Sequence, residues 1–200
     1  MAIGGTAAHG GLQDLPPLVE RAVQACRGAG FDLSCLPSQG RLLQVLAGGV
    51  GSGRIGETGT GGGVGLAWLA SGASPEARLI SVERDQGLVS VARSVFQDTP
   101  AVDILHDDWR ALQAQGPFDL LVLDGGGQGK TEEGPLLPEG WLRPGGLIVI
   151  DDFTPTVGWP PMHQGRPDVA RMFWLGHPRL SAAEVRTQPD AATIVAMFTS

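Results

Sequence analysis

The sequence predicts an α/β fold in which helices cover both faces of a doubly wound, mostly parallel sheet of seven strands. Three observations predict it. Segments that are almost continuously apolar recur along the chain, as in strands buried on both faces. Helical patterns lie between them, and the last two strand candidates are joined by a link too short for a crossover helix. A length of 200 residues with 42% hydrophobic content suits one globular domain.

The chain begins with small residues and glycine, which predict a flexible N-terminal tail over residues 1–11. Residues 12–200 are predicted to form one domain, with N-terminal helices in 12–53 and the cofactor-binding sheet with its helices in 54–200. Apolar residues at helical spacing predict the first helix within Leu12–Ala29, and "SQGRLLQVLAGG" predicts the second.

Five strand candidates then alternate with helices. The strands are Arg54–Thr58, Ala77–Glu83, Ala101–His106, Phe118–Asp124 and Gly145–Asp151. The helical patterns that follow them in turn are "VGLAWLASG", "DQGLVSVARSVF", "DWRALQAQ", "EEGPLLPEGWL" and "PDVARMFWLGH". Such units are right-handed and build a Rossmann-like sheet.

The C-terminal segment "AAEVRTQPDAATIVAMF" contains two strand candidates joined by Gln188, Pro189 and Asp190. This link allows a hairpin only, so one of the last two strands must run antiparallel to the rest of the sheet.

The charge balance argues against a nucleic-acid partner. The net charge is −7 and the sequence pI is about 5.0, whereas binding to a phosphate backbone needs clustered Lys and Arg. The two cysteines, Cys26 and Cys35, have no CxxC partner and are interpreted as reduced thiols. No signal-peptide pattern and no membrane-spanning run is visible, so we expect a cytoplasmic protein without a membrane partner.

The stretch "LVLDGGGQGKT" is close to a nucleotide-binding phosphate loop. That loop requires glycine five residues before the Gly of Gly-Lys-Thr, and this position is Asp124. A carboxylate there would face the phosphates, so the pattern is interpreted as a near-miss.

Glycines follow the first strand at every second position, at Gly59, Gly61 and Gly63. In such sheets ligands bind at the carboxyl ends of the strands. No register of the glycines fits G-x-G-x-x-G, which disfavours a nicotinamide or flavin site.

The segment Glu57–Gly63, "ETGTGGG", matches the E-x-G-x-G-x-G motif of class I S-adenosylmethionine-dependent methyltransferases. The chain resembles this family over nearly its whole length, because "LISVERD", "LHDDWRAL", "FDLLVLD" and "WLRPGGLIVIDD" resemble its later motifs in the same order. The upstream "SQGRLLQVL" is similar to a helix of the small-molecule O-methyltransferase branch.

The resemblance implies a binding site for S-adenosyl-L-methionine. Glu57 and the loop residues Gly59, Thr60, Gly61 and Gly63 would line its methionine part. Glu83 would accept hydrogen bonds from the ribose hydroxyls. Asp108 would accept one from the adenine amino group, with Trp109 as an apolar wall and Asp107 as the alternative to Asp108. The remaining cofactor candidate is Asp124. Structural alternatives are a solvated strand end for Glu83 and a helix cap for Asp108.

Three carboxylates end the fourth and fifth strands: Asp124, Asp151 and Asp152. In the metal-dependent branch of the family these places hold Asp, Asp and Asn, so the resemblance implies a candidate site for Mg²⁺ or Ca²⁺. Two features depart from that pattern. Asp152 replaces the Asn, and Gly125–Gly127 stand where the family has a catalytic lysine; Lys130, the single lysine of the chain, lies a few residues on. Without a metal, Asp124 or Asp151 is a candidate general base.

The proline-rich segment Phe153–Asp168 follows the fifth strand on the ligand side of the sheet. We expect it to form a wall of the acceptor pocket, with Trp159, Met162 and His163 as candidate contacts. His163 is a further candidate base. The structural alternative is a rigid surface loop whose Trp159 packs on the sheet, and for His163 this alternative is preferred.

The resemblance thus implies an enzyme that transfers a methyl group to a small molecule, at a hydroxyl oxygen, by in-line displacement. A homodimer is a further expectation. Two alternatives stay open: a catalytically silent cofactor-binding relative with a regulatory role, and a nucleic-acid methyltransferase. The acidic balance disfavours the second.

Overall fold

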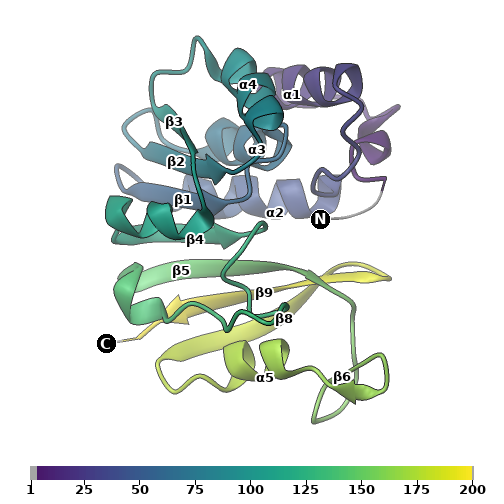
Figure 1. The fold of residues 1–200 in the computed structure, drawn as a ribbon, viewed down its shortest axis with the longest axis vertical. Helices are drawn as coiled ribbons and strands as arrows, with labels where there is room; N and C mark the ends of the chain where they lie inside the picture. The colour runs from purple at the N-terminus through teal and green to yellow at the C-terminus, as the bar shows by residue number, and fades with distance from the viewer. Residues whose placement is uncertain (1–3, 200) are drawn as a thin grey trace.

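Seven strands form one sheet in the order β3-β2-β1-β4-β5-β9-β8 in the computed structural model, which describes residues 4–199. Figure 1 shows them stacked from β3 at the top to β8 at the bottom. The neighbours from β3 to β5 pair in parallel, whereas β9 is antiparallel to both β5 and β8. The predicted sheet with an antiparallel C-terminal strand is therefore confirmed.

The strand bounds lie close to the predicted ones. The strands of the sheet are β1 (Arg54–Thr58), β2 (Arg78–Glu83), β3 (Val102–His106), β4 (Phe118–Leu123), β5 (Leu142–Phe153), β8 (Leu180–Gln188) and β9 (Ala191–Phe198). A separate small hairpin is made of β6 (Met162–His163) and β7 (Arg166–Pro167).

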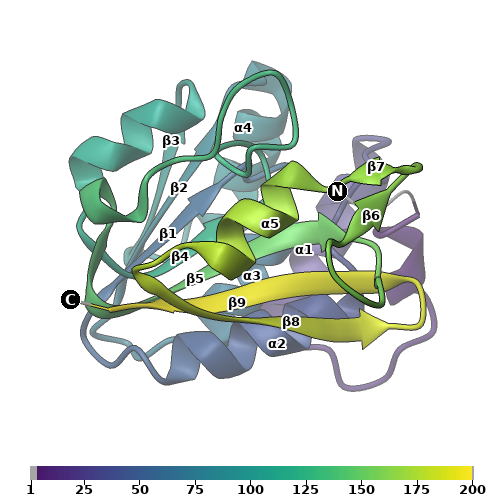
Figure 2. The ribbon, with the colours of Figure 1, turned by 90° about the horizontal axis from the view of Figure 1, so that it is seen from below.

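Helices pack on both faces of the sheet, and each face has its own apolar core. One core joins α1 (Pro17–Gly28), α2 (Pro37–Gly48), α3 (Val64–Gly72) and α4 (Gln86–Phe96). The other lies under α5 (Val169–Gly176) and the 3₁₀ helix η2 (Trp109–Gln115). Figure 2 shows α5 above β9 and β8 and α2 below them, on the opposite face of the sheet.

Local sequence explains where these helices begin. Prolines occupy the first turn of α1 and α2, where the missing N–H has no helical partner in any case. The side chain of Asp85 accepts from the Leu88 N–H at the start of α4, and Asp168 accepts from the Arg171 N–H at the start of α5.

The register of the parallel strands decides which residues meet at their carboxyl ends. Thr58 pairs with Leu123, and Leu123 pairs with Ile150, so the residues that follow, Asp124 and Asp151, are neighbours. Glu57 pairs directly with Ser81 of the next strand.

Two regions differ from the prediction. The segment "EEGPLLPEGWL" is not a helix; within it only η3 (Pro138–Gly140) is helical, because Gly134, Pro135 and Pro138 interrupt the pattern. The short helix predicted at "DWRALQAQ" is the 3₁₀ helix η2.

None of the helices described between residues 4 and 199 is long and apolar enough to cross a membrane.

The N-terminal segment from Gly4 to Gly11 is packed, in contrast to the expected flexible tail, while residues 1–3 lie outside the described part of the chain. It contains the short 3₁₀ helix η1 (Ala7–His9). Thr6 is buried and donates to the Phe31 carbonyl at 2.8 Å. The indole N–H of Trp68 donates to Nε2 of buried His9 at 3.3 Å.

Candidate functional site

The glycine loop between β1 and α3 depends on backbone that other residues rarely adopt. Gly59, Gly61 and Gly63 have φ values of 83°, 54° and 96°. A Cβ on Gly59 would lie 2.4 Å from the Cα of Gly125, so the loops after β1 and β4 are in backbone contact. The loop predicted to bind the cofactor therefore touches the loop that begins at Asp124.

Glu57 lies at the base of this loop and is 2% exposed. Its carboxylate accepts from the Ser81 hydroxyl at 2.6 Å, and the Thr60 hydroxyl lies 2.6 Å from the same Ser81 oxygen. Burial raises the pKa of Glu57 to about 8, although the Ser81 hydrogen bond acts in the opposite direction. A positively charged ligand group beside Glu57 would reverse this shift by stabilising the carboxylate.

Glu83 ends β2 and accepts two backbone N–H groups. One is Gly61 of the glycine loop and the other is Asp85, each at 2.9 Å. The carboxylate of this half-buried residue thus links the first two strand ends. It keeps lone pairs for further donors, such as hydroxyl groups.

A cavity of about 510 Å³ opens beside these residues. Glu83, Asp107, Asp108 and Trp109 line it on one side, and the loop Gly125–Gly134 lines it on the other. Trp109 stacks on Trp141, with ring centroids 5.8 Å apart. A Cβ on Gly126 would lie 2.3 Å from the Trp109 ring, so glycine at this position makes room for the aromatic wall.

Asp108 has the local role that the structural alternative expects, and it also lines the cavity. Its carboxylate accepts from the backbone N–H of Arg110 at 3.0 Å, and this bond is the main reason why its pKa is lowered. The guanidinium of Arg110 bridges Asp108 and Glu133, at 2.9 Å from each.

The space next to Glu57 is small. A pocket of about 10 Å³ lies among Glu57, Gly61, Asp124 and the segment Phe31–Cys35. This is about the room of a single water molecule. The structure therefore brings the motif residues together, but a larger group beside Glu57 requires the segment Phe31–Cys35 to shift.

The three predicted metal ligands meet at the ends of β4 and β5. One oxygen from each of Asp124, Asp151 and Asp152 lies within 4.8 Å of the others. Burial raises the pKa of Asp124. Burial and then the nearby Asp124 raise that of Asp151 to about 7. Asp152 has a φ of 66°, which is unusual for a residue with a side chain. Clustered carboxylate oxygens are the donors that Mg²⁺ and Ca²⁺ prefer, so the donor set fits such an ion.

Lys130 reaches the same strand ends, although Gly125–Gly127 separate it from Asp124. Its ammonium donates to the Asp151 carbonyl and, at 2.6 Å, to the Asp152 carbonyl. It also lies 4.0 Å from the centroid of the Phe153 ring. The residue as a whole is exposed, but its ammonium is partly buried, and this lowers the pKa of Lys130 to about 8.

A second cavity of about 580 Å³ lies on the other side of Lys130. Phe153, His163, Arg166 and Arg171 contribute to its walls, so part of the segment Phe153–Asp168 borders this cavity. His163 lines this cavity and not the small pocket at Asp124. Trp159 is 65% exposed and Met162 is 45% exposed.

A third cavity, of about 460 Å³, lies beside the carboxylates. It is bordered by Gln39 of α2, by Asp151–Thr154 and by the β8–β9 turn at Asp190.

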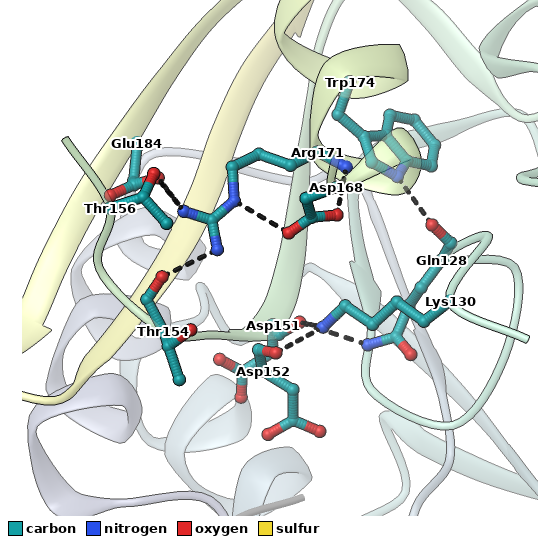
Figure 3. A network of polar contacts seen from close by, with 10 residues as sticks. All are labelled: Gln128, Lys130, Asp151, Asp152, Thr154, Thr156, Asp168, Arg171, Trp174 and Glu184. Atoms are coloured by element: carbon teal, nitrogen blue, oxygen red, sulfur yellow. Dashed lines mark hydrogen bonds and ion pairs between the residues drawn. The ribbon is translucent and has the colours of Figure 1, made fainter. Parts of the chain in front are cut away.

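A polar network that the sequence did not reveal supports this side of the site (Figure 3). Arg171 of α5 is fully buried and pairs with Asp168 at 3.1 Å and with Glu184 at 2.8 Å. It also donates to the Thr154 carbonyl at 2.7 Å. The sequence contained one signal of this network, an arginine on the apolar face of the last helix. A charge buried on such a face needs oppositely charged partners, and Asp168 and Glu184 are these partners.

Comparison with known proteins supports the same interpretation. Residues 57–153 match the family model described as a methyltransferase domain. A catechol O-methyltransferase from Mycobacterium tuberculosis is 32% identical over 124 residues, which cover 57% of this chain and 54% of that protein. The alignment thus spans about half the length of this curated relative.

Two solved structures have the same fold. An O-methyltransferase from Bacillus cereus, in complex with SAH, superimposes with a TM-score of 0.72 and 21% identity, covering 98% of this chain and 96% of the other. An O-methyltransferase of tomaymycin synthesis from Streptomyces achromogenes, in complex with SAM, superimposes with a TM-score of 0.73 and 22% identity. The alignment again covers 98% of this chain and 96% of the other.

Residues 57–153 are thus similar to a methyltransferase domain, and the whole chain has the fold of the two solved O-methyltransferases. The class that the chain resembles is that of the S-adenosylmethionine-dependent small-molecule O-methyltransferases.

Proposed function

We propose that this protein transfers the methyl group of S-adenosylmethionine to a hydroxyl oxygen of a small molecule. The observation that carries the proposal is the junction of two cavities. Gly129, Lys130 and Thr131 line both the first cavity, beside Glu83 and Asp108, and the second, beside Phe153 and His163. A cofactor in the first cavity and an acceptor in the second would meet at Lys130.

The chemistry of the junction suits methyl transfer. S-adenosylmethionine, when bound, supplies a methyl group on a positively charged sulfur. The chain must hold the acceptor oxygen in line with that group, exclude water and accept the hydroxyl proton. We assign the proton to the Lys130 amine, since a pKa of about 8 leaves part of it neutral near physiological pH. Asp151 is the alternative acceptor of the proton.

The proposed cofactor contacts follow the geometry. Glu57 would pair with the ammonium of the methionine part, after Phe31–Cys35 shifts. Glu83 would accept from the ribose hydroxyls, and Asp108 from the adenine amino group beside Trp109. Gly59–Gly63 would allow the close approach of the backbone.

The carboxylates Asp124, Asp151 and Asp152 would hold a divalent cation, which when bound lowers the pKa of an acceptor hydroxyl. The chelator EDTA is then expected to abolish turnover, and added Mg²⁺ to restore it. Full turnover of Asp124→Ala and Asp152→Ala with EDTA present would exclude the metal site and leave Lys130 as the activating group.

Two measurements test the function. Calorimetry with S-adenosylhomocysteine should give a one-to-one complex, and a Glu83→Ala variant should weaken it. Incubation with S-adenosylmethionine carrying a labelled methyl group and a panel of catechols, phenols and hydroxy acids should then give a methylated product. Binding that is unaffected by Glu83→Ala would contradict the cofactor site, and binding without any turnover would favour the silent relative.

Three finer predictions accompany the proposal. The acidic charge balance favours a small-molecule partner over nucleic acid. Tight, salt-sensitive binding of tRNA at low salt would contradict it. A cytoplasmic location and a homodimer stay predictions, which fractionation and light scattering would check.

A further inference from the structure

We propose that Gln128 and Trp174 act together as a clamp that positions Lys130 at the junction of the two cavities. Both act on Lys130 and are therefore positioning residues, although Gln128 also belongs to the loop that lines the first cavity. The inference rests on the proposed function of Lys130, but it also concerns the conformation of the loop Asp124–Gly134, which is measurable without turnover.

The side chain of Gln128 ties the loop to two strand ends, and Figure 3 shows the one at Asp151. Its amide nitrogen donates to the Leu123 carbonyl at 2.9 Å and to the Asp151 carbonyl at 3.3 Å. Both protons of the amide are therefore used, one on the last residue of β4 and one near the end of β5. These are the strands whose ends carry the carboxylates.

Trp174 holds the same residue from the other side. Its indole N–H donates to the backbone carbonyl of Gln128 at 2.9 Å. Trp174 is 0% exposed in α5, whose start is fixed by Arg171 and Asp168. Gln128 is thus bonded through its side chain to the sheet and through its backbone to the helix that packs on the sheet.

This double attachment decides where Lys130 lies, two residues further on. Four of the five residues from Gly125 to Gly129 are glycines, and Gly127 and Gly129 have φ values of 78° and 77°. Such a segment has many conformations open to it when unattached. A lysine side chain also loses entropy when it is fixed. A rigid anchor next to Lys130 lowers the cost of holding its ammonium on the Asp151 and Asp152 carbonyls.

A simpler explanation gives Gln128 and Trp174 a purely structural role, with Lys130 held by its own contacts to the carbonyls and to Phe153. The two explanations differ in one respect. A clamp acts on turnover only through Lys130, whereas a structural role lowers turnover whether or not Lys130 is present.

The first test uses the single lysine of the chain. A lysine-specific endoprotease can cut this protein after Lys130 only, so its rate reports the opening of the loop. Gln128→Met removes the amide at similar size, and Trp174→Phe removes the N–H while keeping an aromatic ring. Each should raise the rate of cleavage about tenfold, as expected for the loss of one or two buried hydrogen bonds. Gln97→Met, at an exposed glutamine after α4, is the matched control and should leave it unchanged.

The second test uses kinetics in two backgrounds. Gln128→Met should lower kcat about tenfold with KM for S-adenosylmethionine unchanged, and it should have no further effect in the Lys130→Met background. Gln128→Asn, which keeps the amide, should recover part of the rate.

Cleavage at the wild-type rate in both variants would overturn the clamp, and so would an equal fall of kcat in the Lys130→Met background. Should no acceptor be turned over, the proposed function fails while the cleavage rates still decide the inference. Thermal unfolding checks that Trp174→Phe is folded.

Discussion

The two halves of the carboxyl edge of the sheet are built in different ways. In the half around β1 and β2, Glu57, Ser81, Glu83 and Gly61 contact one another across adjacent strand ends. These contacts span 22 and 24 positions. In the half around β4 and β5, Trp174 meets Gln128 across 46 positions, from a helix near the end of the chain. The first half follows from one motif and its register, and the second depends on a helix that packs at the end of the chain.

This difference suggests a division of labour. The first half is the one proposed to hold the cofactor, and contacts between a single motif and the neighbouring strand suffice to build it. The second half would suit one particular acceptor, and its glycine-rich loop depends on a residue of the distant helix α5. The following variants test this comparison, from the largest expected effect to the smallest.

Gly59→Ala should break the contact between the two halves. Its Cβ would lie 2.4 Å from the Gly125 Cα, and φ is 83°, so backbone must move in both loops. We expect binding of S-adenosylhomocysteine to weaken by at least about a thousandfold, measured by calorimetry. Gly51→Ala is the control, because Gly51 has a φ of 66° with nothing within 4 Å of a Cβ. Equal effects of the two substitutions would show that the close approach is unimportant.

Arg171→Met should damage the acceptor half most. It leaves Asp168 and Glu184, whose side chains are 11% and 18% exposed, without their shared cation. We expect the free energy of unfolding to fall by about 3–5 kcal/mol, measured by urea denaturation. Arg179→Met removes a 3.6 Å pair with Glu139 at the surface and should cost less than about 1 kcal/mol.

Lys130→Met should lower turnover, which depends on the half around β4 and β5, and leave cofactor binding by the other half unchanged. Turnover should fall about a hundredfold, as for the loss of a general base, while binding of S-adenosylhomocysteine stays within about twofold. Stopped assays with the labelled cofactor give kcat, and calorimetry gives the affinity. Retained turnover would transfer the role of base to Asp151.

The pH dependence of cofactor binding tests the first half alone. The pKa of Glu57 is about 8, so the unliganded protein holds this proton at neutral pH. Pairing with an ammonium favours the carboxylate, so binding should release a proton and strengthen by up to about tenfold between pH 6 and 7. Calorimetry in buffers of different ionisation enthalpy measures the release, and Glu57→Gln should abolish it.

The raised pKa of Glu57 also makes the stability of the unliganded protein depend on pH. Between the usual pKa of 4.5 and about 8, the unfolded chain releases the Glu57 proton more readily than the folded one. The unliganded protein should therefore become less stable as pH rises through this range, and Glu57→Gln should flatten the curve. A rise in stability from this residue would contradict the shift.

The sequence by itself determined the sheet and the positions of the residues proposed to bind the cofactor. Alternating apolar strands and helices predicted the strand bounds, and the short link at Pro189 predicted the antiparallel β9. The motif Glu57–Gly63 and the strand ends Glu83, Asp124 and Asp151 could be placed because parallel strands bring their carboxyl ends to one edge. These features depend on short-range patterns and on register.

Only the tertiary structure decided the rest. The prolines of the segment before β5 leave it without the predicted helix, and the N-terminal segment packs through His9 and Trp68 instead of fraying. Above all, the three glycines after Asp124 suggested a site without its lysine, whereas the folded loop returns Lys130 to the strand ends. Which distant side chains satisfy the hydrogen bonds of a glycine-rich loop is set by packing, because the loop itself specifies no single conformation.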